Sequence, residues 1–169
     1  MNDDKDYIEE EFAETTETRT DYEIERNKPM PSFNHGSIQT NLGFLIKLNY
    51  RKKYRAVSEV TIKLDDWVSV PDLGIYPFEK LDVANDVIKT ERAPLCTIEI
   101  LSPKQNLEEL LQKARNYFKC GVKSCWIVIA GLKNVYVFSD MENYEIYRSG
   151  EVLKDAALGI ELNTEEIFE

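Results

Sequence analysis

The chain has 169 residues, of which 43% are hydrophobic and 31% charged, and its formal net charge is −10. These values are typical of one globular domain that is large enough to bury a hydrophobic core. No stretch approaches the roughly 20 apolar residues of a membrane span, and the acidic N-terminus lacks the basic-then-apolar build of a signal peptide. The sequence therefore predicts a cytoplasmic protein with no membrane partner.

The negative charge is concentrated at the N-terminus. Residues 1–26 carry 11 acidic and 3 basic side chains, whereas the rest of the chain carries 20 acidic and 18 basic ones. We expect residues 1–20 to form an acidic, poorly ordered segment, with a short first helix as the alternative, and residues 21–169 to form a single domain. Because counterion release rewards local basic patches, the nearly neutral body does not exclude DNA binding.

The three cysteines indicate reduced thiols. Their number is odd, and Cys96 and Cys125 lie inside apolar runs, which favours packed thiols over a disulfide framework. The spacing of Cys120 and Cys125, together with a single histidine in the chain, argues against a zinc site.

The first third of the chain predicts one strand and one long helix. Residues 21–28 are expected to form a strand, and the prolines of 29–32 an extended connection. Ser32 or Asn34 can cap a helix over 35–50. The apolar residues at helical spacing on it are Ile38, Leu42, Leu45 and Leu48. The basic run 51–55 at its end is either a solvated helix terminus or a contact to a phosphate backbone.

The remainder alternates strands and helices. Strands are expected over 56–64 and 67–76 with a turn at Asp65 and Asp66, followed by a long loop or short helix over 79–94. A strand over 95–101, a helix that begins at Ser102 and ends at Gly121, and a buried strand over 124–130 predict a right-handed βαβ unit. Residues 135–138 and 144–147 predict a hairpin, and a short helix is expected near Glu165.

Two carboxylates stand out in this pattern. Glu99 interrupts an apolar strand, and burying an acid is costly unless something pairs with it. Asp72 ends a strand that could pair beside it. Strand alternation places Glu99 and Leu101 on the face opposite Ile100. Two carboxylates and a backbone carbonyl can hold Mg²⁺, which lowers the pKa of a bound water and offsets charge on a phosphate.

A lysine near these acids would orient that water or stabilise the transition state. The residue two positions after Glu99 is Leu101, so the strand itself supplies no lysine. Lys113 and Arg115 each border the core stripe of the following helix, and periodicity alone does not choose between them. The stem of Lys113 could pack on the helix while its amine reaches the end of the sheet.

Several short stretches, taken in order, resemble the Uma-two family, whose members are classed as restriction endonucleases. They are Tyr22-Glu23-Ile24-Glu25-Arg26, Pro29-Met30-Pro31-Ser32 with His35, Val70-Pro71-Asp72, Ile98-Glu99-Ile100-Leu101-Ser102-Pro103, Lys113 with Tyr117, and Leu158-Gly159-Ile160-Glu161-Leu162. The resemblance covers nearly the whole chain, from residue 20 to residue 169. It implies an α/β (α+β mixed) fold, namely a restriction-endonuclease-like core of the PD-(D/E)XK type with a central mixed sheet flanked by helices.

The resemblance also implies roles for particular residues. Asp72 matches the aspartate of the family motif and Glu99 its second acid, and both would bind Mg²⁺ or Mn²⁺ together with the carbonyl of Ile100. Lys113 is similar to the motif lysine relocated to the following helix. These residues form the expected catalytic and metal site.

Three further residues match polar positions of the family and are candidate supporting residues. They are Glu23, His35 and Ser102. His35 is expected either to touch a phosphate or water in the site or to cap its helix. Helix capping is the default interpretation of Ser102.

Two functions from different classes follow. The first is a metal-dependent DNA endonuclease that hydrolyses phosphodiester bonds with a magnesium-activated water, and a homodimer is compatible with it because cutting two strands takes two sites. The alternative is a non-catalytic interaction or regulatory module that keeps the nuclease fold, favoured by the absence of a long basic stripe. A third hypothesis is that the acidic N-terminus folds over its own DNA groove.

Overall fold

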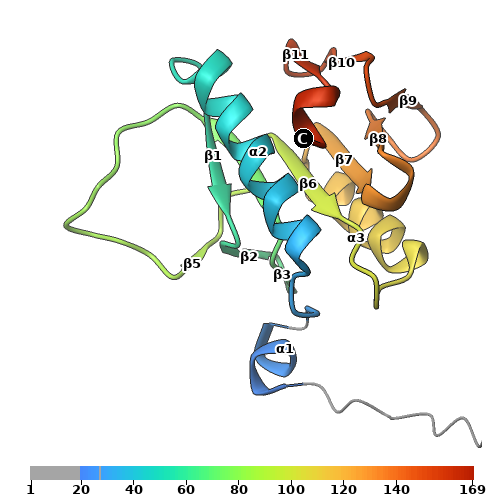
Figure 1. The fold of residues 1–169 in the computed structure, drawn as a ribbon. Helices are drawn as coiled ribbons and strands as arrows, with labels where there is room; N and C mark the ends of the chain where they lie inside the picture. Colours follow the sequence, from blue (N-terminus) through green and yellow to red (C-terminus); the bar gives the residue numbers. More distant parts are fainter. Residues whose placement is uncertain (1–19, 27) are drawn as a thin grey trace, which may run out of the picture.

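A six-stranded mixed sheet forms the centre of the molecule (Figure 1), in a computed structural model that describes residues 20–26 and 28–169. The strand order is β1-β4-β6-β7-β8-β9, and β6 and β7 are parallel while all other neighbours are antiparallel. These strands are β1 Tyr54–Ser58, β4 Leu73–Pro77, β6 Cys96–Ile100, β7 Ser124–Ile129, β8 Asn134–Phe138 and β9 Tyr144–Arg148. The predicted fold class is confirmed.

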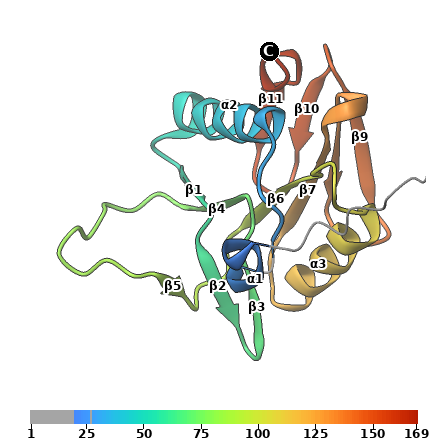
Figure 2. The same cartoon turned by 60° about the horizontal axis from the view of Figure 1, so that its bottom comes forward.

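One long helix covers each face of the sheet (Figures 1 and 2). Ile98 and Ile100 of β6 pack in the hydrophobic cluster that includes α2 (Phe33–Tyr50). Leu101 and Ile127 pack in the other cluster, with α3 (Leu107–Lys119). The predicted alternation of β6 is therefore confirmed, and Glu99 is turned toward α3.

Helix α2 begins at Phe33, two residues before the predicted start, and the first of the two predicted caps is the one used. Ser32 is the N-cap, and its Oγ accepts the amide of His35 at 3.2 Å. Leu42 is fully buried, but the expected core residue Leu48 is 60% exposed, and Ile46 is buried instead. Six residues beyond Leu42, Leu48 points about 120° away from it around the helix axis, which takes it off the buried stripe.

The strand predicted over 21–28 is wrong, because these residues begin with helix α1 (Asp21–Arg26). A capping box starts this helix: Glu23 Oε2 accepts the amide of Thr20 at 2.8 Å, and Thr20 Oγ1 accepts the amide of Glu23 at 3.3 Å. The acidic segment predicted over 1–20 lies, up to residue 19, outside the described residues and stays a prediction.

The two long strand runs are each broken in the structure. The predicted strand 56–64 is divided at Glu59, whose φ is +56°, and the predicted strand 67–76 is divided between Ser69 and Leu73. The second part of the first run and the first part of the second run pair with each other, outside the main sheet. Together with a short strand from the 79–94 connection they form a small sheet of order β3-β2-β5. Its strands are β2 Thr61–Leu64, β3 Trp67–Ser69 and β5 Lys89–Thr90. The Asp65-Asp66 turn and the long 79–94 connection are confirmed.

Helix α3 begins later than predicted. Its N-cap is Asn106, whose Oδ1 accepts the amide of Glu109 at 2.9 Å, so the expectation that Ser102 caps it is wrong. The end is as predicted, with Gly121 at φ +88° just after the last turn. Strands β6 and β7 on either side of α3 are parallel neighbours, as the βαβ pattern requires.

The C-terminal part contains one hairpin more than the sequence indicated. The β8–β9 hairpin and a short helix at Glu165–Ile167 are confirmed, and β10 (Val152–Asp155) pairs with β11 (Ile160–Asn163) between them. Asp155 ties this addition to the sheet, because its Oδ2 accepts bonds from Ser124 Oγ at 2.6 Å and Trp126 Nε1 at 2.7 Å.

Two further expectations can be compared with the structure. All three cysteines are unpaired, and Cys96 and Cys125 are buried as predicted. Among the described helices, none combines the length and apolar character needed to cross a bilayer.

Candidate active site

Asp72 and Glu99 lie at neighbouring positions of the central sheet. Asp72 directly precedes β4, and Glu99 lies in β6, with Leu73 opposite Ile98 in the antiparallel pairing of the two strands. Each carboxylate side chain is only 1% exposed. The amide of Ile100 donates to Asp72 Oδ2 at 2.6 Å, which fixes Asp72 against the end of β6.

Glu99 is held by two side chains of α3. Its Oε1 lies 2.7 Å from the Lys113 ammonium and accepts the Tyr117 hydroxyl at 2.7 Å. The same hydroxyl is 2.8 Å from Ser69 Oγ. Burial raises the pKa of Glu99, and the charge of Asp72 raises it further, while the ammonium of Lys113 acts against this; the net shift is upward.

Asp72 is held from the opposite side. Its Oδ1 forms an ion pair with Lys28 and lies 3.0 Å from His35 Nε2. Burial opposes ionisation, but the hydrogen bond from His35 and the charge of Lys28 outweigh it and lower the pKa of Asp72 to about 2. Gln39 Nε2 donates to the Asp72 carbonyl at 3.0 Å, so α2 also fixes the backbone.

Sequence reasoning missed two members of the site, Lys28 and Glu59. The Lys28 ammonium lies 2.9 Å from Glu59 Oε1, and Arg26 Nη2 lies 2.9 Å from Glu59 Oε2. Burial alone would lower the pKa of Lys28, but the charges of Asp72 and Glu99 outweigh it and raise the pKa. Glu59 could have been found, because it is an acid inside a predicted strand, as Glu99 is. Lys28 gave no such signal, since its partners are far along the chain.

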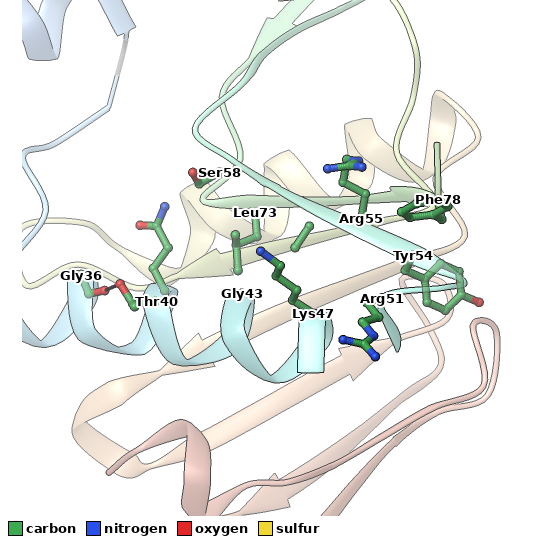
Figure 3. A pocket seen from close by; sticks show the side chains of 12 residues that line it. Gly36, Thr40, Gly43, Lys47, Arg51, Tyr54, Arg55, Ser58, Leu73 and Phe78 are labelled. Atoms are coloured by element: carbon green, nitrogen blue, oxygen red, sulfur yellow. Dashed lines mark hydrogen bonds between the residues drawn. The ribbon is translucent and has the colours of Figure 1, made fainter. Parts of the chain in front are cut away.

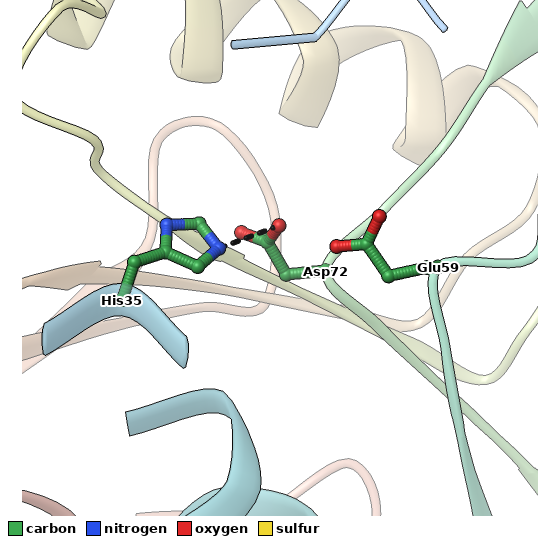
Figure 4. A group of neighbouring side chains, drawn as sticks. All are labelled: His35, Glu59 and Asp72. Carbon is green, nitrogen blue, oxygen red and sulfur yellow. Dashed lines mark hydrogen bonds and ion pairs between the residues drawn. The ribbon is translucent and has the colours of Figure 1, made fainter. Parts of the chain in front are cut away.

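Three potential ligand side chains come together around Asp72 (Figure 4). Ligand atoms of His35, Glu59 and Asp72 all lie within 4.8 Å of one another. Carboxylate oxygens suit Mg²⁺ and Mn²⁺, and an imidazole nitrogen suits transition metals. The ammonium of Lys28 already bridges the two carboxylates. The donor set therefore fits a small divalent cation at a place where the protein favours positive charge.

The candidate supporting residues have separate positions. Ser102 Oγ lies 3.0 Å from His35 Nδ1, so Ser102 and His35 form a buried chain that ends at Asp72. The imidazole thus orients Asp72 and does not cap α2. Glu23 accepts the amides of Thr20 and Met30 at 2.8 and 2.9 Å, which places it at the start of α1.

Two clefts open beside this cluster. The first, of about 620 Å³, is bounded by Arg26, Pro29, β3 and α3, and both Lys28 and Lys113 line it. The second, of about 550 Å³, lies between α2 and β1 and includes Gln39 and Ser58 (Figure 3). Each cleft is lined by residues that contact the buried acids, namely Lys28 and Lys113 in the first and Gln39 in the second.

The mixed sheet with a helix on each face, and the two buried acids at the start of β4 and in β6, agree with the expected restriction-endonuclease-like core. The model of the Uma2 family, described as "Putative restriction endonuclease", matches residues 9–165, and the chain belongs to this family. A solved structure from Anabaena variabilis ATCC 29413, described as a putative nuclease belonging to DUF820, has the same fold. It superposes with a TM-score of 0.72 at 22% identity and covers 83% of each chain. A search of the curated proteins found no match.

Proposed function

We propose that this protein is a metal-dependent DNA endonuclease that hydrolyses phosphodiester bonds. The observation that carries the proposal is the pair Asp72 and Glu99, two almost fully buried acids that lie just before β4 and in the adjacent β6, each in contact with its own lysine. Isolated charges at this depth are costly, so such an arrangement needs either a function or full compensation.

Asp72 and Glu99, with the carbonyl of Ile100, would hold a Mg²⁺ or Mn²⁺ ion. When bound, such an ion activates a water molecule and offsets the charge that develops on the scissile phosphate. Glu59 and His35, whose ligand atoms lie within 4.8 Å of each other and of an Asp72 ligand atom, form a second candidate ligand set with Asp72. Asp72 is the residue common to both ligand sets, and we assign it the central role.

Lys113 would act on the attacking water and on the phosphate. Its ammonium lies beside Glu99, and the side chain lines the cleft and is 21% exposed, so it is partly shielded from solvent. A donor held in such a place stabilises developing negative charge better than one in bulk water, because it needs no reorganisation during the reaction. Tyr117 would keep Glu99 in position through its hydroxyl.

Lys28 would tune the site. Its ammonium contacts Asp72, the residue that would also bind the cation, and it contacts Glu59 as well. When Asp72 binds a cation, Lys28 can keep Glu59 as its partner and extend toward a phosphate in the first cleft, which it lines. This arrangement keeps the carboxylates neutralised before substrate and metal arrive.

One observation favours the second candidate, a non-catalytic interaction module. The three acids Asp72, Glu99 and Glu59 contact three basic side chains, namely Lys28, Lys113 and Arg26. This network is electrically balanced without a metal. In that function the acids would serve only to hold the N-terminal segment and α3 on the sheet.

Strand cleavage of supercoiled plasmid DNA with Mg²⁺ or Mn²⁺ distinguishes the two. The wild-type protein should nick the plasmid, EDTA should abolish nicking, and Asp72→Asn should slow it at least about 100-fold. Asp66→Asn, in the exposed β2–β3 turn, is the matched control and should cut like the wild type. Equal background nicking by wild type and Asp72→Asn would reject the endonuclease and support the module.

A further inference from the structure

The cleft between α2 and β1 has the features of a nucleic-acid groove (Figure 3). We propose that it binds a single strand of nucleic acid and leads the phosphate backbone of that strand toward Asp72 and Glu59. The inference rests on the proposed function and deepens it, since it assigns a single-stranded segment as the substrate class.

The charge of the cleft is the first argument. Lys47, Arg51 and Arg55 line it, and none of its lining residues is acidic, although the chain has a net charge of −10. Within the described part of the chain, no hydrogen bond or ion pair engages the side chain of Lys47 or Arg51. Both cations are therefore available to a phosphate backbone, whose binding is dominated by such contacts.

The floor of the cleft is the second argument. The small residues Gly36, Thr40 and Gly43 of α2 line the floor, so few side-chain atoms project from the helix into the cleft there. A Cβ added at Gly36 would meet nothing within 4 Å, and one at Gly43 would meet only Leu73 Cδ2, at 3.9 Å. From Gly36 to Arg51 the helix rises about 22 Å at 1.5 Å per residue, so the groove can follow an extended polymer over several units.

The outer end of the cleft presents an aromatic ring. Phe78 is 48% exposed, and the guanidinium of Arg55 lies 5.4 Å from its ring centroid. Proteins that bind single strands combine a basic groove with exposed aromatic rings on which bases stack. A duplex is instead read by elements that protrude into its grooves, so a recessed cleft favours a single strand.

At its inner end the cleft is separated from the carboxylates by the side chain of Gln39. Gln39 lines the cleft and donates to the Asp72 carbonyl at 3.0 Å, and its Nε2 is 3.5 Å from Glu59 Oε1. Ser58, another lining residue, directly precedes Glu59. The phosphate backbone of a nucleic-acid strand that lies along α2 would thus approach the site from the side opposite Lys113.

Fluorescence anisotropy of a labelled single-stranded oligodeoxynucleotide, measured in EDTA over a range of salt concentrations, tests the proposal. The double variant Lys47→Gln/Arg51→Gln should bind at least about 10-fold more weakly, and its slope of log K against log salt should be shallower by about 1.4, or 0.7 for each lost contact. The control Lys52→Gln/Lys63→Gln makes the same charge change at exposed residues outside the cleft and should retain the wild-type slope. Equal loss in both double variants would overturn the proposal.

A second variant tests the cleft without changing its charge. Gly43→Leu fills the floor and replaces glycine by a better helix former, so the fold should be retained while oligonucleotide affinity falls at least about 10-fold. Unchanged affinity would contradict the proposal, as would tighter binding of the matching duplex or equal binding of anionic phospholipid vesicles.

The groove and the endonuclease can fail separately. If the wild type does not cut plasmid but the expected binding results are obtained, the endonuclease is rejected and the groove stands. If the wild type cuts plasmid but the cleft variants bind the oligonucleotide as the wild type does, the endonuclease stands and the groove is rejected.

Discussion

The ammonium of Lys113 on α3 lies 2.7 Å from Oε1 of Glu99 on β6. The contact joins a helix residue to a buried strand acid, and it gives the sheet the lysine that the strand lacks at Leu101. In the proposed mechanism, Lys113 would act from this place on the phosphate and water that a strand lysine would otherwise serve.

Lys113→Met tests this contact while preserving the packing of the aliphatic stem. Plasmid cleavage should fall at least about 100-fold, because a preorganised cation beside the developing charge is lost. The matched control is Lys119→Met, on an exposed position at the end of the same helix, which should cleave normally. Equal rates for the two variants would remove Lys113 from the proposed mechanism.

Tyr117→Phe removes the hydroxyl that lies between Glu99 and Ser69. Deleting a buried hydrogen-bond partner should lower the free energy of unfolding by about 1–3 kcal/mol and leave Glu99 less well fixed. Urea unfolding and the cleavage rate, measured together, check this. In Tyr136→Phe, where no hydrogen bond of the hydroxyl is recorded in the described residues, both quantities should remain close to those of the wild type.

Lys28→Met removes the cation that bridges Asp72 and Glu59. We expect the variant to be less stable without metal, because two neighbouring carboxylates lose their counter-charge, and to gain more stability from Mn²⁺ than the wild type. Thermal unfolding with and without millimolar Mn²⁺ measures both effects. The exposed Lys63→Met is the control, and a Mn²⁺-induced shift no larger in Lys28→Met than in wild type would contradict the expectation.

Asp72 also makes stability depend on pH. Its pKa is lowered in the folded state from 3.8 to about 2, so its contribution is present above about pH 4 and is lost as the pH falls toward 2. The shift corresponds to about 2 kcal/mol at 1.36 kcal/mol per pH unit. The difference in unfolding free energy between wild type and Asp72→Asn should therefore shrink on acidification from pH 5 to pH 2. A difference that stays constant over this range would show that the charge of Asp72 is not stabilised as described.

Local patterns in the sequence were enough to predict the central part of the fold. The strand–helix–strand order around Glu99 and the alternation of β6 depend on periodicity and burial over short stretches, and both are confirmed. The break at Glu59 was not predicted, because a left-handed backbone conformation at a single residue other than glycine leaves no trace in a strand-like sequence. The capping box at Thr20 and Glu23, by contrast, has a sequence signature, a threonine followed three residues later by a glutamate, and this signature predicts the start of a helix where a strand was expected.

Only part of the candidate site could be predicted from the sequence, because the other part depends on contacts between distant segments. Asp72, Glu99 and Lys113 belong to the start of β4, to its sheet neighbour β6 and to the helix α3 that follows β6, so their order in the chain indicated their approach. Lys28, Glu59 and the Ser102–His35 pair join them through contacts between distant parts of the chain, which depend on how α2 and the N-terminal segment pack on the sheet. The helix-capping interpretation of Ser102 shows the consequence, since Asn106 caps α3 and leaves Ser102 free to bond His35.

The account depends most directly on whether Asp72 is part of a divalent metal centre. Isothermal titration of Mn²⁺ into wild-type protein, Asp72→Asn and the surface control Asp66→Asn measures this, with circular dichroism to verify that each is folded. We predict saturable binding to the wild type and to Asp66→Asn, and its loss in Asp72→Asn. Absence of binding to folded wild-type protein at millimolar Mn²⁺, or unchanged binding by Asp72→Asn, would contradict the account.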